Sequence, residues 1–184
     1  MSRMAEETGR AEPVRRALDL VSLFCADLDR FGSLSVAARG DLPADECELL
    51  DHGGHMTVTM ERHHHCRLDL RVIAERNDDD GYAREILLAT PAGRVVQYGI
   101  VRIDLSAVDA ATAAAIRDRG APLGRILLAA GLLCDVQHVN LLEIEPGPHL
   151  RGLVGGAGRS FGRVAEIAVD GRPTIELLEI VVAT

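Results

Sequence analysis

The chain has 184 residues, a formal net charge of -8 and no Lys, so that all 20 of its basic residues are Arg. This length predicts one domain, and the core must be aliphatic because the chain holds only two Tyr, three Phe and no Trp. Schiff-base chemistry, pyridoxal phosphate anchoring and the phosphate-binding loop all need a Lys and are therefore excluded. An acidic chain without a basic run is also not expected to bind nucleic acid.

The cysteines and the N-terminus indicate a reduced, soluble protein. The four cysteines are widely spaced and form no Cys-x-x-Cys pair, which predicts free thiols and no zinc or redox site. The first residues are polar where a signal peptide needs an apolar stretch, and no run of about 18 apolar residues follows. We therefore expect a cytoplasmic protein that does not enter a membrane.

The N-terminal third is expected to be mainly helical. Residues 1–12 are small and charged without an apolar period, which predicts a disordered tail ahead of a single domain over 13–184. Apolar residues at spacings of three and four then predict a helix over 14–30. A short helix is predicted over 43–50, and 55–64 is either another short helix or an irregular segment.

The middle of the chain alternates apolar and polar residues, as half-buried strands do. Such strands are predicted over 67–74, 82–89 and 94–104. Turn-forming residues occupy 77–81 and 90–93, so the last two strands form a tight antiparallel hairpin.

Helices and strands mix in the C-terminal half. Ser106 is placed to cap a helix over 107–119 that Gly120 ends, and a shorter helix runs over 122–128. A strand over 134–145 follows.

The chain closes with a glycine-rich loop and a hairpin. The loop over 152–162 is either a mobile lid or a plain turn. Strands over 162–169 and 174–182 form the hairpin, with Asp170 and Gly171 as its turn. Strands cluster without the regular alternation of a parallel sheet, so the predicted class is α+β, a single mostly antiparallel β-sheet with helices packed on one face.

Arg84 lies in one of the predicted strands, on the same face as Ile86 and Leu88. If that face is the core, the guanidinium needs an anion, because Arg cannot shed its charge. The partner is either an internal carboxylate such as Glu179 or a ligand carboxylate held in a bidentate manner. From periodicity alone the internal pair, or an exposed Arg on an edge strand, is favoured.

Glu176 and Glu179 occupy the last apolar strand with opposite parity, so one of them lies on the less solvated face. A carboxyl group in an apolar pocket has a raised pKa and can donate or accept a proton. The alternative is a glutamate at the sheet edge in water.

Three consecutive histidines at 63–65, with His52 and His55 upstream, suggest a metal site. His63 and His65 have suitable spacing on a strand. No further ligand completes a motif with them, so a solvated polar segment is the favoured interpretation, and we expect no metal.

Several short motifs, taken in order, resemble the chorismate lyase (chorismate pyruvate-lyase) family, whose fold is shared with the ligand-binding UTRA domains of bacterial regulators. The resemblance covers roughly residues 43 to 182. Its motifs are Met56–Thr57, Arg84 to Leu88 (Arg-Glu-Ile-Leu-Leu), Pro122 to Arg125 (Pro-Leu-Gly-Arg), Gly162–Arg163, Gly171 to Pro173 (Gly-Arg-Pro) and Glu179.

The resemblance implies a site and a reaction. Arg84 and Glu179 would be the catalytic pair, with Arg84 clamping the ring carboxylate and Glu179 contacting the hydroxyl at the opposite end of the ring. The backbone amides of Met56 and Leu123 would assist Arg84. The implied reaction is the cofactor-free elimination of pyruvate from chorismate, which gives 4-hydroxybenzoate, in a monomer or homodimer.

One position departs from the family pattern. Where better-known members have an Arg on the second strand, this chain has Ile100, and Asp104 replaces the Pro that follows. Arg102 shares the parity of Ile100 and could hold the second carboxylate, as could Arg125. The alternatives are a lyase-fold enzyme for another aromatic or enolpyruvyl acid and a non-catalytic, UTRA-like module that binds a small acid.

Overall fold

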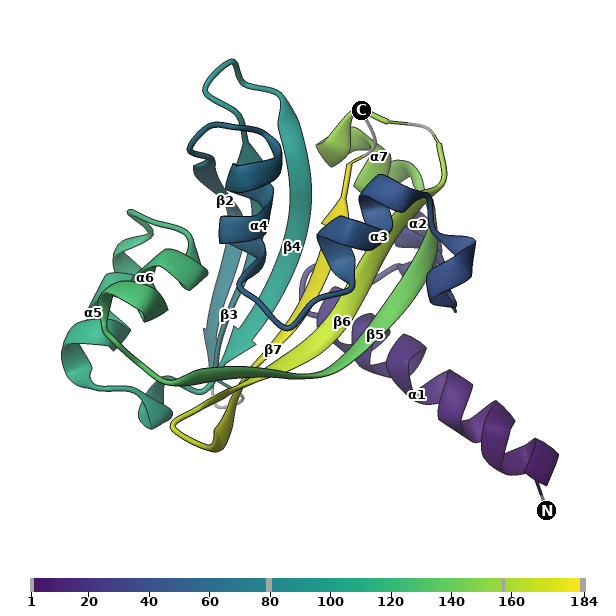
Figure 1. Ribbon diagram of the computed structural model, residues 1–184, viewed down its shortest axis with the longest axis horizontal. Helices are drawn as coiled ribbons and strands as arrows, with labels where there is room; N and C mark the ends of the chain where they lie inside the picture. Colours follow the sequence, from purple (N-terminus) through teal and green to yellow (C-terminus); the bar gives the residue numbers. More distant parts are fainter. Residues whose placement is uncertain (1, 79–80, 157, 183–184) are drawn as a thin grey trace.

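A single open sheet of seven strands organises the molecule (Figure 1). The computed structural model describes residues 2–78, 81–156 and 158–182. Neighbouring strands are all antiparallel, in the order β1-β5-β6-β7-β4-β3-β2, which confirms the α+β class. The strands are β1 (Gly32–Val36), β2 (Asp69–Asp78), β3 (Gly81–Ala89), β4 (Val95–Ile103), β5 (Cys134–Pro146), β6 (Ser160–Val169) and β7 (Arg172–Val181).

Short helices fill the connections. They are α1 (Ser2–Ser22), α2 (Leu28–Phe31), α3 (Ala44–Leu50), α4 (Met56–His63), α5 (Ala110–Asp118), α6 (Leu123–Ala129) and α7 (Pro148–Val154), with 3-10 turns at Arg39–Asp41 and Leu105–Ala107. None of these helices, within the described ranges, is long and apolar enough to cross a membrane. The four cysteines are free thiols.

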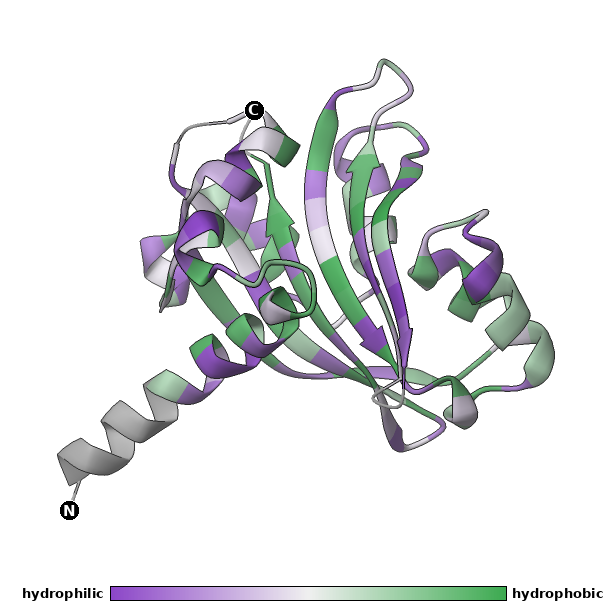
Figure 2. Cartoon of the chain, turned by 180° about the vertical axis from the view of Figure 1, so that it is seen from behind, coloured by the Kyte–Doolittle hydropathy of each residue, from purple (hydrophilic) through white to green (hydrophobic). Residues whose placement is uncertain are grey.

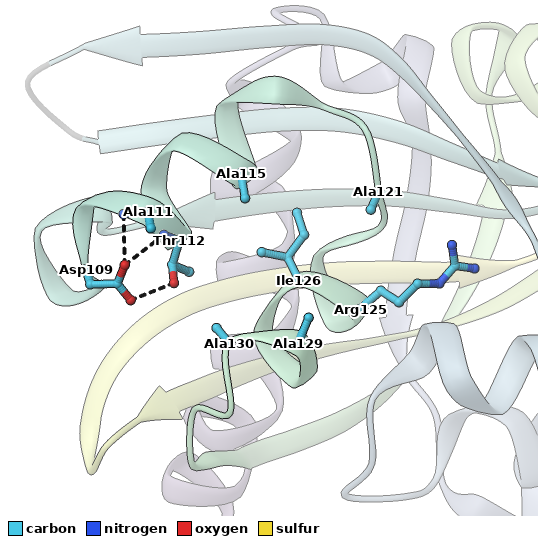
Figure 3. Close-up of a pocket in the computed structure, with 9 residues that line it drawn as sticks. All are labelled: Asp109, Ala111, Thr112, Ala115, Ala121, Arg125, Ile126, Ala129 and Ala130. Carbon is cyan, nitrogen blue, oxygen red and sulfur yellow. Dashed lines mark hydrogen bonds between the residues drawn. The ribbon is translucent and has the colours of Figure 1, made fainter.

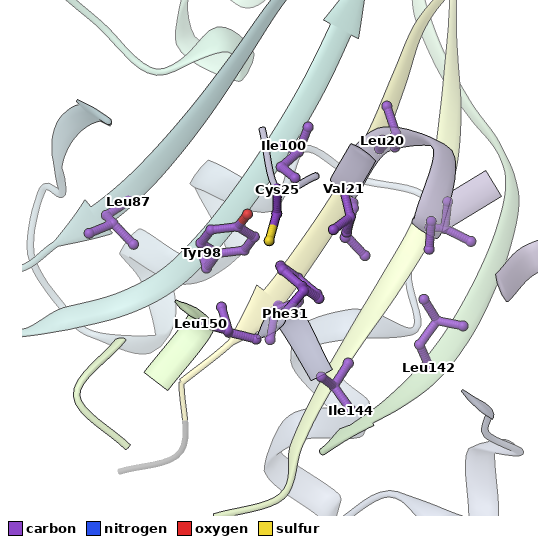
Figure 4. Packing of buried hydrophobic residues seen from close by; sticks show 14 residues of the cluster. Leu20, Val21, Cys25, Phe31, Leu87, Tyr98, Ile100, Leu142, Ile144 and Leu150 are labelled. Atoms are coloured by element: carbon purple, nitrogen blue, oxygen red, sulfur yellow. The ribbon is translucent and has the colours of Figure 1, made fainter. Parts of the chain in front are cut away.

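The helices lie against both faces of the sheet, where the sequence predicted one. On one face, α1, α2 and α7 bury Leu20, Phe31 and Leu150 against Tyr98 and Ile100 of β4 (Figure 4). On the other face, α3 and α4 cover the ends of β3 and β4, and α6 covers the neighbouring part. Both faces need a cover because β3 and β4 are buried along almost their whole length, and Figure 2 shows hydrophobic residues running along these central strands.

The N-terminal segment differs from its prediction. Helix α1 begins at Ser2, although 1–12 was expected to be disordered. A small, charged segment cannot bury a core of its own, and its composition therefore predicts disorder. Here the segment instead continues a helix that Ala17 and Leu20 anchor to the core further along the chain. The helix expected over 14–30 is divided, since α1 ends at Ser22 and α2 begins at Leu28.

The helix α5 starts later than predicted because Asp109, not Ser106, caps it. The Asp109 carboxylate accepts hydrogen bonds from the amides of Ala111 (2.8 Å) and Thr112 (2.9 Å), as Figure 3 shows. An Asp that meets two otherwise unpaired amides is a strong N-cap. At the other end, Arg119 and not Gly120 adopts the left-handed conformation, with φ 61°.

The C-terminal hairpin is confirmed, and the glycine-rich loop is shorter than predicted. Asp170 (φ 49°) and Gly171 (φ 79°) both have positive φ, as a two-residue hairpin turn requires. Gly152 lies in α7, which ends at Val154, and Gly162 lies in β6, so the loop or lid expected over 152–162 is partly helix and partly strand.

Candidate functional site

Arg84 is fully buried on the sheet face beneath α4 and α6, with 0% of its surface exposed. Its Nη1 donates to the carbonyl oxygen of Ile116 at 3.4 Å, whereas Nε and Nη2 have no hydrogen-bond partner among the described residues. Burial lowers the pKa of the Arg84 guanidinium, but a guanidinium keeps its proton in proteins. The N–H groups on Nε and Nη2 form one edge of the planar fork, which is the edge that binds a carboxylate in a bidentate manner.

Neither interpretation that periodicity favoured, an internal pair with Glu179 or an exposed Arg on an edge strand, holds for Arg84. It is not at a sheet edge, because β3 lies between β4 and β2, and Glu179 pairs with another arginine. Glu75 faces Arg84 across the β2–β3 ladder. The oxygens of Glu75 already accept from Tyr82 Oη at 3.2 Å and Arg119 Nη2 at 3.3 Å. Tyr82 and Glu75 partly offset the effect of burial on the pKa of Arg84. No described carboxylate forms an ion pair with Arg84, and its Nε and Nη2 edge has no hydrogen-bond partner among the described residues.

Glu179 lies on the same face as Arg84, two strands away on β7. Arg84 is opposite Val101 on β4, and Glu179 is opposite Gly99 on the same strand. With about 4.8 Å between strands and about 3.3 Å per residue, the Cα atoms of Arg84 and Glu179 are about 12 Å apart. Glu176 lies on the opposite face, as its parity predicted, and its side chain is 37% exposed against 12% for Glu179. Glu179 is thus the carboxylate on the less solvated face.

Arg163 is the site residue that the sequence reasoning missed. It is 1% exposed, and its Nε donates to Glu179 Oε2 at 2.8 Å. Its Nη1 donates to the carbonyl oxygens of His52 (2.8 Å) and Leu50 (3.3 Å), and its Nη2 donates to that of Gly54 (3.4 Å). Arg163 therefore holds the segment between α3 and α4 on the sheet, and most of its donors are used. A single Arg in the apolar run of β6 was the signal, and it is the same signal that identified Arg84.

A narrow cavity connects these groups. It has a volume of about 40 Å³ and lies between the sheet and the starts of α4 and α6. Ligand sites for small organic molecules usually measure about 300–1,000 Å³, so the cavity as it stands is too small for a ligand of that size. Its polar lining includes Arg84, Gln97, Arg163 and Glu179, and its apolar lining includes Ile86, Leu88, Val101 and Leu177.

Met56 and Leu123 lie where the resemblance implied, at the cavity. Each is the first residue of its helix, α4 and α6 respectively. The first amides of an α-helix have no acceptor within the helix, so these two N–H groups can donate to a ligand.

Arg102 and Arg125 do not line the cavity, which corrects both predictions. Arg102 lies on the opposite face of β4, where its Nε donates to Glu176 Oε2 at 2.7 Å. The register puts Val101 opposite Arg84, so Ile100 and Arg102 point away from the site. Arg125 instead forms an ion pair with Glu61 that joins α6 to α4.

A wider groove of about 520 Å³ lies between α5 and α6, and mainly alanines line it (Figure 3). Both of its charged residues are already engaged, Asp109 in the cap of α5 and Arg125 with Glu61. The narrow cavity, with its unpaired guanidinium edge, is therefore the stronger candidate site.

The histidines do not assemble a metal centre in the described part of the chain, where no three His, Cys, Asp or Glu side chains are grouped to hold an ion. His55 lines the cavity and His52 lies behind it. Burial lowers the pKa of both imidazoles. The charge of Arg163 lowers the pKa of His52 further, whereas Glu179 partly offsets the effect of burial on the pKa of His55. Both imidazoles are therefore mainly neutral at pH 7 and leave Arg84 as the unpaired positive group.

Comparison with known proteins adds no assignment to this site. No model of a known protein family matches the chain. A search of curated proteins finds no match either.

Proposed function

We propose that this chain is a chorismate pyruvate-lyase, a cofactor-free carbon–oxygen lyase that converts chorismate to 4-hydroxybenzoate and pyruvate. The observation that carries the proposal is the free Nε and Nη2 edge of Arg84, which is buried in a mostly apolar cavity. A buried, unpaired guanidinium is unfavourable unless an anion satisfies it. A ring carboxylate supplies that anion in the geometry that the fork prefers.

In this proposal the ring lies between Arg84 and Glu179. The carboxylate of the ring accepts from Arg84 and from the amides of Met56 and Leu123, and the ring hydroxyl lies at the Glu179 end of the cavity. The Cα atoms of Arg84 and Glu179 are about 12 Å apart, and the ring would occupy the space between the two head groups once the cavity has opened. The apolar walls suit the faces of the ring, as in most small-molecule sites.

The proposed reaction needs few catalytic groups from the protein. The bond between ring C3 and the ether oxygen breaks, the hydrogen on C4 is transferred to the methylene carbon of the side chain, and pyruvate leaves as the ring becomes aromatic. All atoms are accounted for without an added oxidant or base. The residues need only fix the reactive conformer and match its charges, which is a task of positioning and electrostatics.

The second carboxylate of chorismate needs a cation other than Arg102 or Arg125, because neither lines the cavity. Arg163 lies beside Glu179, and its Nη2 makes only a long hydrogen bond, 3.4 Å, to Gly54. Exchanging that bond for the substrate carboxylate as the cavity opens is the step that the proposal requires of Arg163.

A second candidate is a non-catalytic module that binds a small acid. The supporting observation is that Glu179 already pairs with Arg163, which leaves one unpaired positive group for one carboxylate. A lyase-fold enzyme for another aromatic or enolpyruvyl acid is the third candidate, and it would use the same two ends of the cavity.

The test is to incubate chelator-treated protein with chorismate and to follow pyruvate and 4-hydroxybenzoate together. We expect both products in equal amounts, loss of activity in Arg84→Ala, and unchanged activity in Arg102→Ala, a matched arginine on the opposite face. Neither product above the spontaneous background contradicts the lyase proposal. Tight, Arg84-dependent binding of 4-hydroxybenzoate without turnover supports the binding module, and loss of activity only after chelation points to a metal.

A further inference from the structure

Gln97, on β4, carries a second unsatisfied group of the cavity. Its side chain is 2% exposed, and its Nε2 donates to Glu179 Oε1 at 3.5 Å. The amide cannot be reversed without bringing its own oxygen against the carboxylate of Glu179. Gln97 Oε1 therefore points away from Glu179, and no described residue donates to it.

The two unsatisfied groups are complementary in kind and lie on one face of the sheet. Arg84 offers donors and a positive charge, whereas Gln97 offers an acceptor. Gln97 is opposite Leu88 on β3, four residues along the strand from Arg84, which corresponds to about 13 Å. A ligand that satisfies both groups has an anionic acceptor at one end and a hydrogen-bond donor at the other.

We propose that Gln97 is the specificity-determining residue of this site, and that it selects acids with a hydroxyl or amino group at the end opposite the carboxylate. This inference rests on the proposed placement of the ring between Arg84 and Glu179. Its physical basis is that leaving a buried acceptor without a partner costs more free energy than forming an average hydrogen bond gains. Both oxygens of Glu179 already accept hydrogen bonds, from Arg163 and from Gln97. A ligand hydroxyl at that end therefore donates its one hydrogen to Gln97 Oε1, whereas a ligand without a donor leaves this oxygen unpaired and shielded from water.

The experiment measures the dissociation constants of benzoate, 4-hydroxybenzoate and 4-methoxybenzoate by titration calorimetry on the full chain. We expect the wild-type protein to bind 4-hydroxybenzoate at least about 10-fold more tightly than benzoate. 4-Methoxybenzoate should bind worst, since it presents only an acceptor to Gln97. In Gln97→Leu the preference for the hydroxyl should fall to about 3-fold or less, with benzoate binding retained.

Gln137→Leu is the matched control, because Gln137 is the other glutamine of the chain and its neighbour Val136, not Gln137, lines the cavity. This variant should keep the wild-type preference. Gln97→Asn retains an amide that is too short to reach the same position, so it should lose the preference even if Gln97→Leu does not fold.

The inference is overturned by a wild-type protein that does not distinguish the three acids, or by a folded Gln97 variant that keeps the full preference. Absence of binding by any of the acids would also overturn it. Chorismate turnover is measured separately. A Gln97-dependent preference without turnover would support Gln97 as the selecting residue while contradicting the lyase proposal.

Discussion

Replacing Arg84 with Met is expected to stabilise the protein while abolishing the proposed binding of aromatic acids. Arg84 is 0% exposed and makes one long hydrogen bond, and the nearest carboxylate, Glu75, is used by Tyr82 and Arg119. Burying an ion costs several kcal/mol, and replacing buried ionic groups with apolar side chains is neutral or stabilising by about 1–4 kcal/mol. Met has a similar length and fits beside apolar neighbours. We expect the free energy of unfolding of Arg84→Met to rise by about 1–4 kcal/mol.

Arg163→Met provides the matched control, because Arg163 is equally buried on the same face. Its donors bind Glu179 and the carbonyl oxygens of His52 and Leu50. Removing it leaves a buried carboxylate and carbonyl groups unpaired, which should lower the free energy of unfolding by about 3–5 kcal/mol. The two buried arginines should thus give effects of opposite sign.

The assay is urea unfolding followed by far-ultraviolet circular dichroism, since the chain has no Trp. If the same signal is followed during heating, the melting temperature should change by about 2–4 °C for each kcal/mol of change in the free energy of unfolding, in a chain of this size. If Arg84→Met proves as destabilising as Arg163→Met, the Arg84 guanidinium is satisfied within the protein, and the reasoning that reserves it for a ligand is refuted.

Two further predictions concern stability. Tyr98 Oη donates to the buried Glu85 at 2.7 Å, so Tyr98→Phe should cost about 1–3 kcal/mol in urea unfolding, and a wild-type midpoint would contradict this. The lowered pKa values of His52 and His55 mean that the unfolded chain binds more protons than the folded chain below about pH 6.5. Stability should therefore fall as the pH decreases from 7 to 5, and less steeply when both are replaced by Gln; a slope unaffected by the double substitution would exclude them as the cause.

Much of the sheet could be predicted because its signals are local. Alternation within the central strands and the Asp170–Gly171 turn can be recognised from neighbouring residues alone. The four strands β3, β4, β6 and β7 accordingly lie close to their predicted positions. The cap of α5 was misplaced because Ser106 and Asp109 are both good caps by residue type. Only the surrounding backbone shows that Asp109 meets two amides, whereas Ser106 lies within a 3-10 turn.

The sequence prediction placed Arg102 on the wrong face of the sheet, because it was wrong by one residue in the pairing of β3 with β4. Arg102 was chosen because it shares the parity of Ile100, yet the register pairs Arg84 with Val101. Since alternate residues point to opposite faces, a shift of one residue moves a side chain through the sheet. Arg102 therefore lies on the opposite face with Glu176. The β3–β4 ladder shifts by one residue between Leu88 and Ala89, and without that shift Arg84 would lie opposite Ile100. Alternation alone does not reveal such a bulge.

Arg84 and Arg163 illustrate what sequence cannot supply even when a residue is recognised. Each is one Arg in an apolar strand, and the same periodicity argument applies to both. Arg163 is satisfied by carbonyl groups from residues more than 100 positions earlier in the chain, whereas Arg84 is met by a single carbonyl at 3.4 Å. The two buried arginines thus differ in what the rest of the fold brings to their donors, which the local sequence pattern does not show. The buried group that the fold leaves unsatisfied, Arg84 with Gln97 beyond it, is where a ligand has the most to contribute.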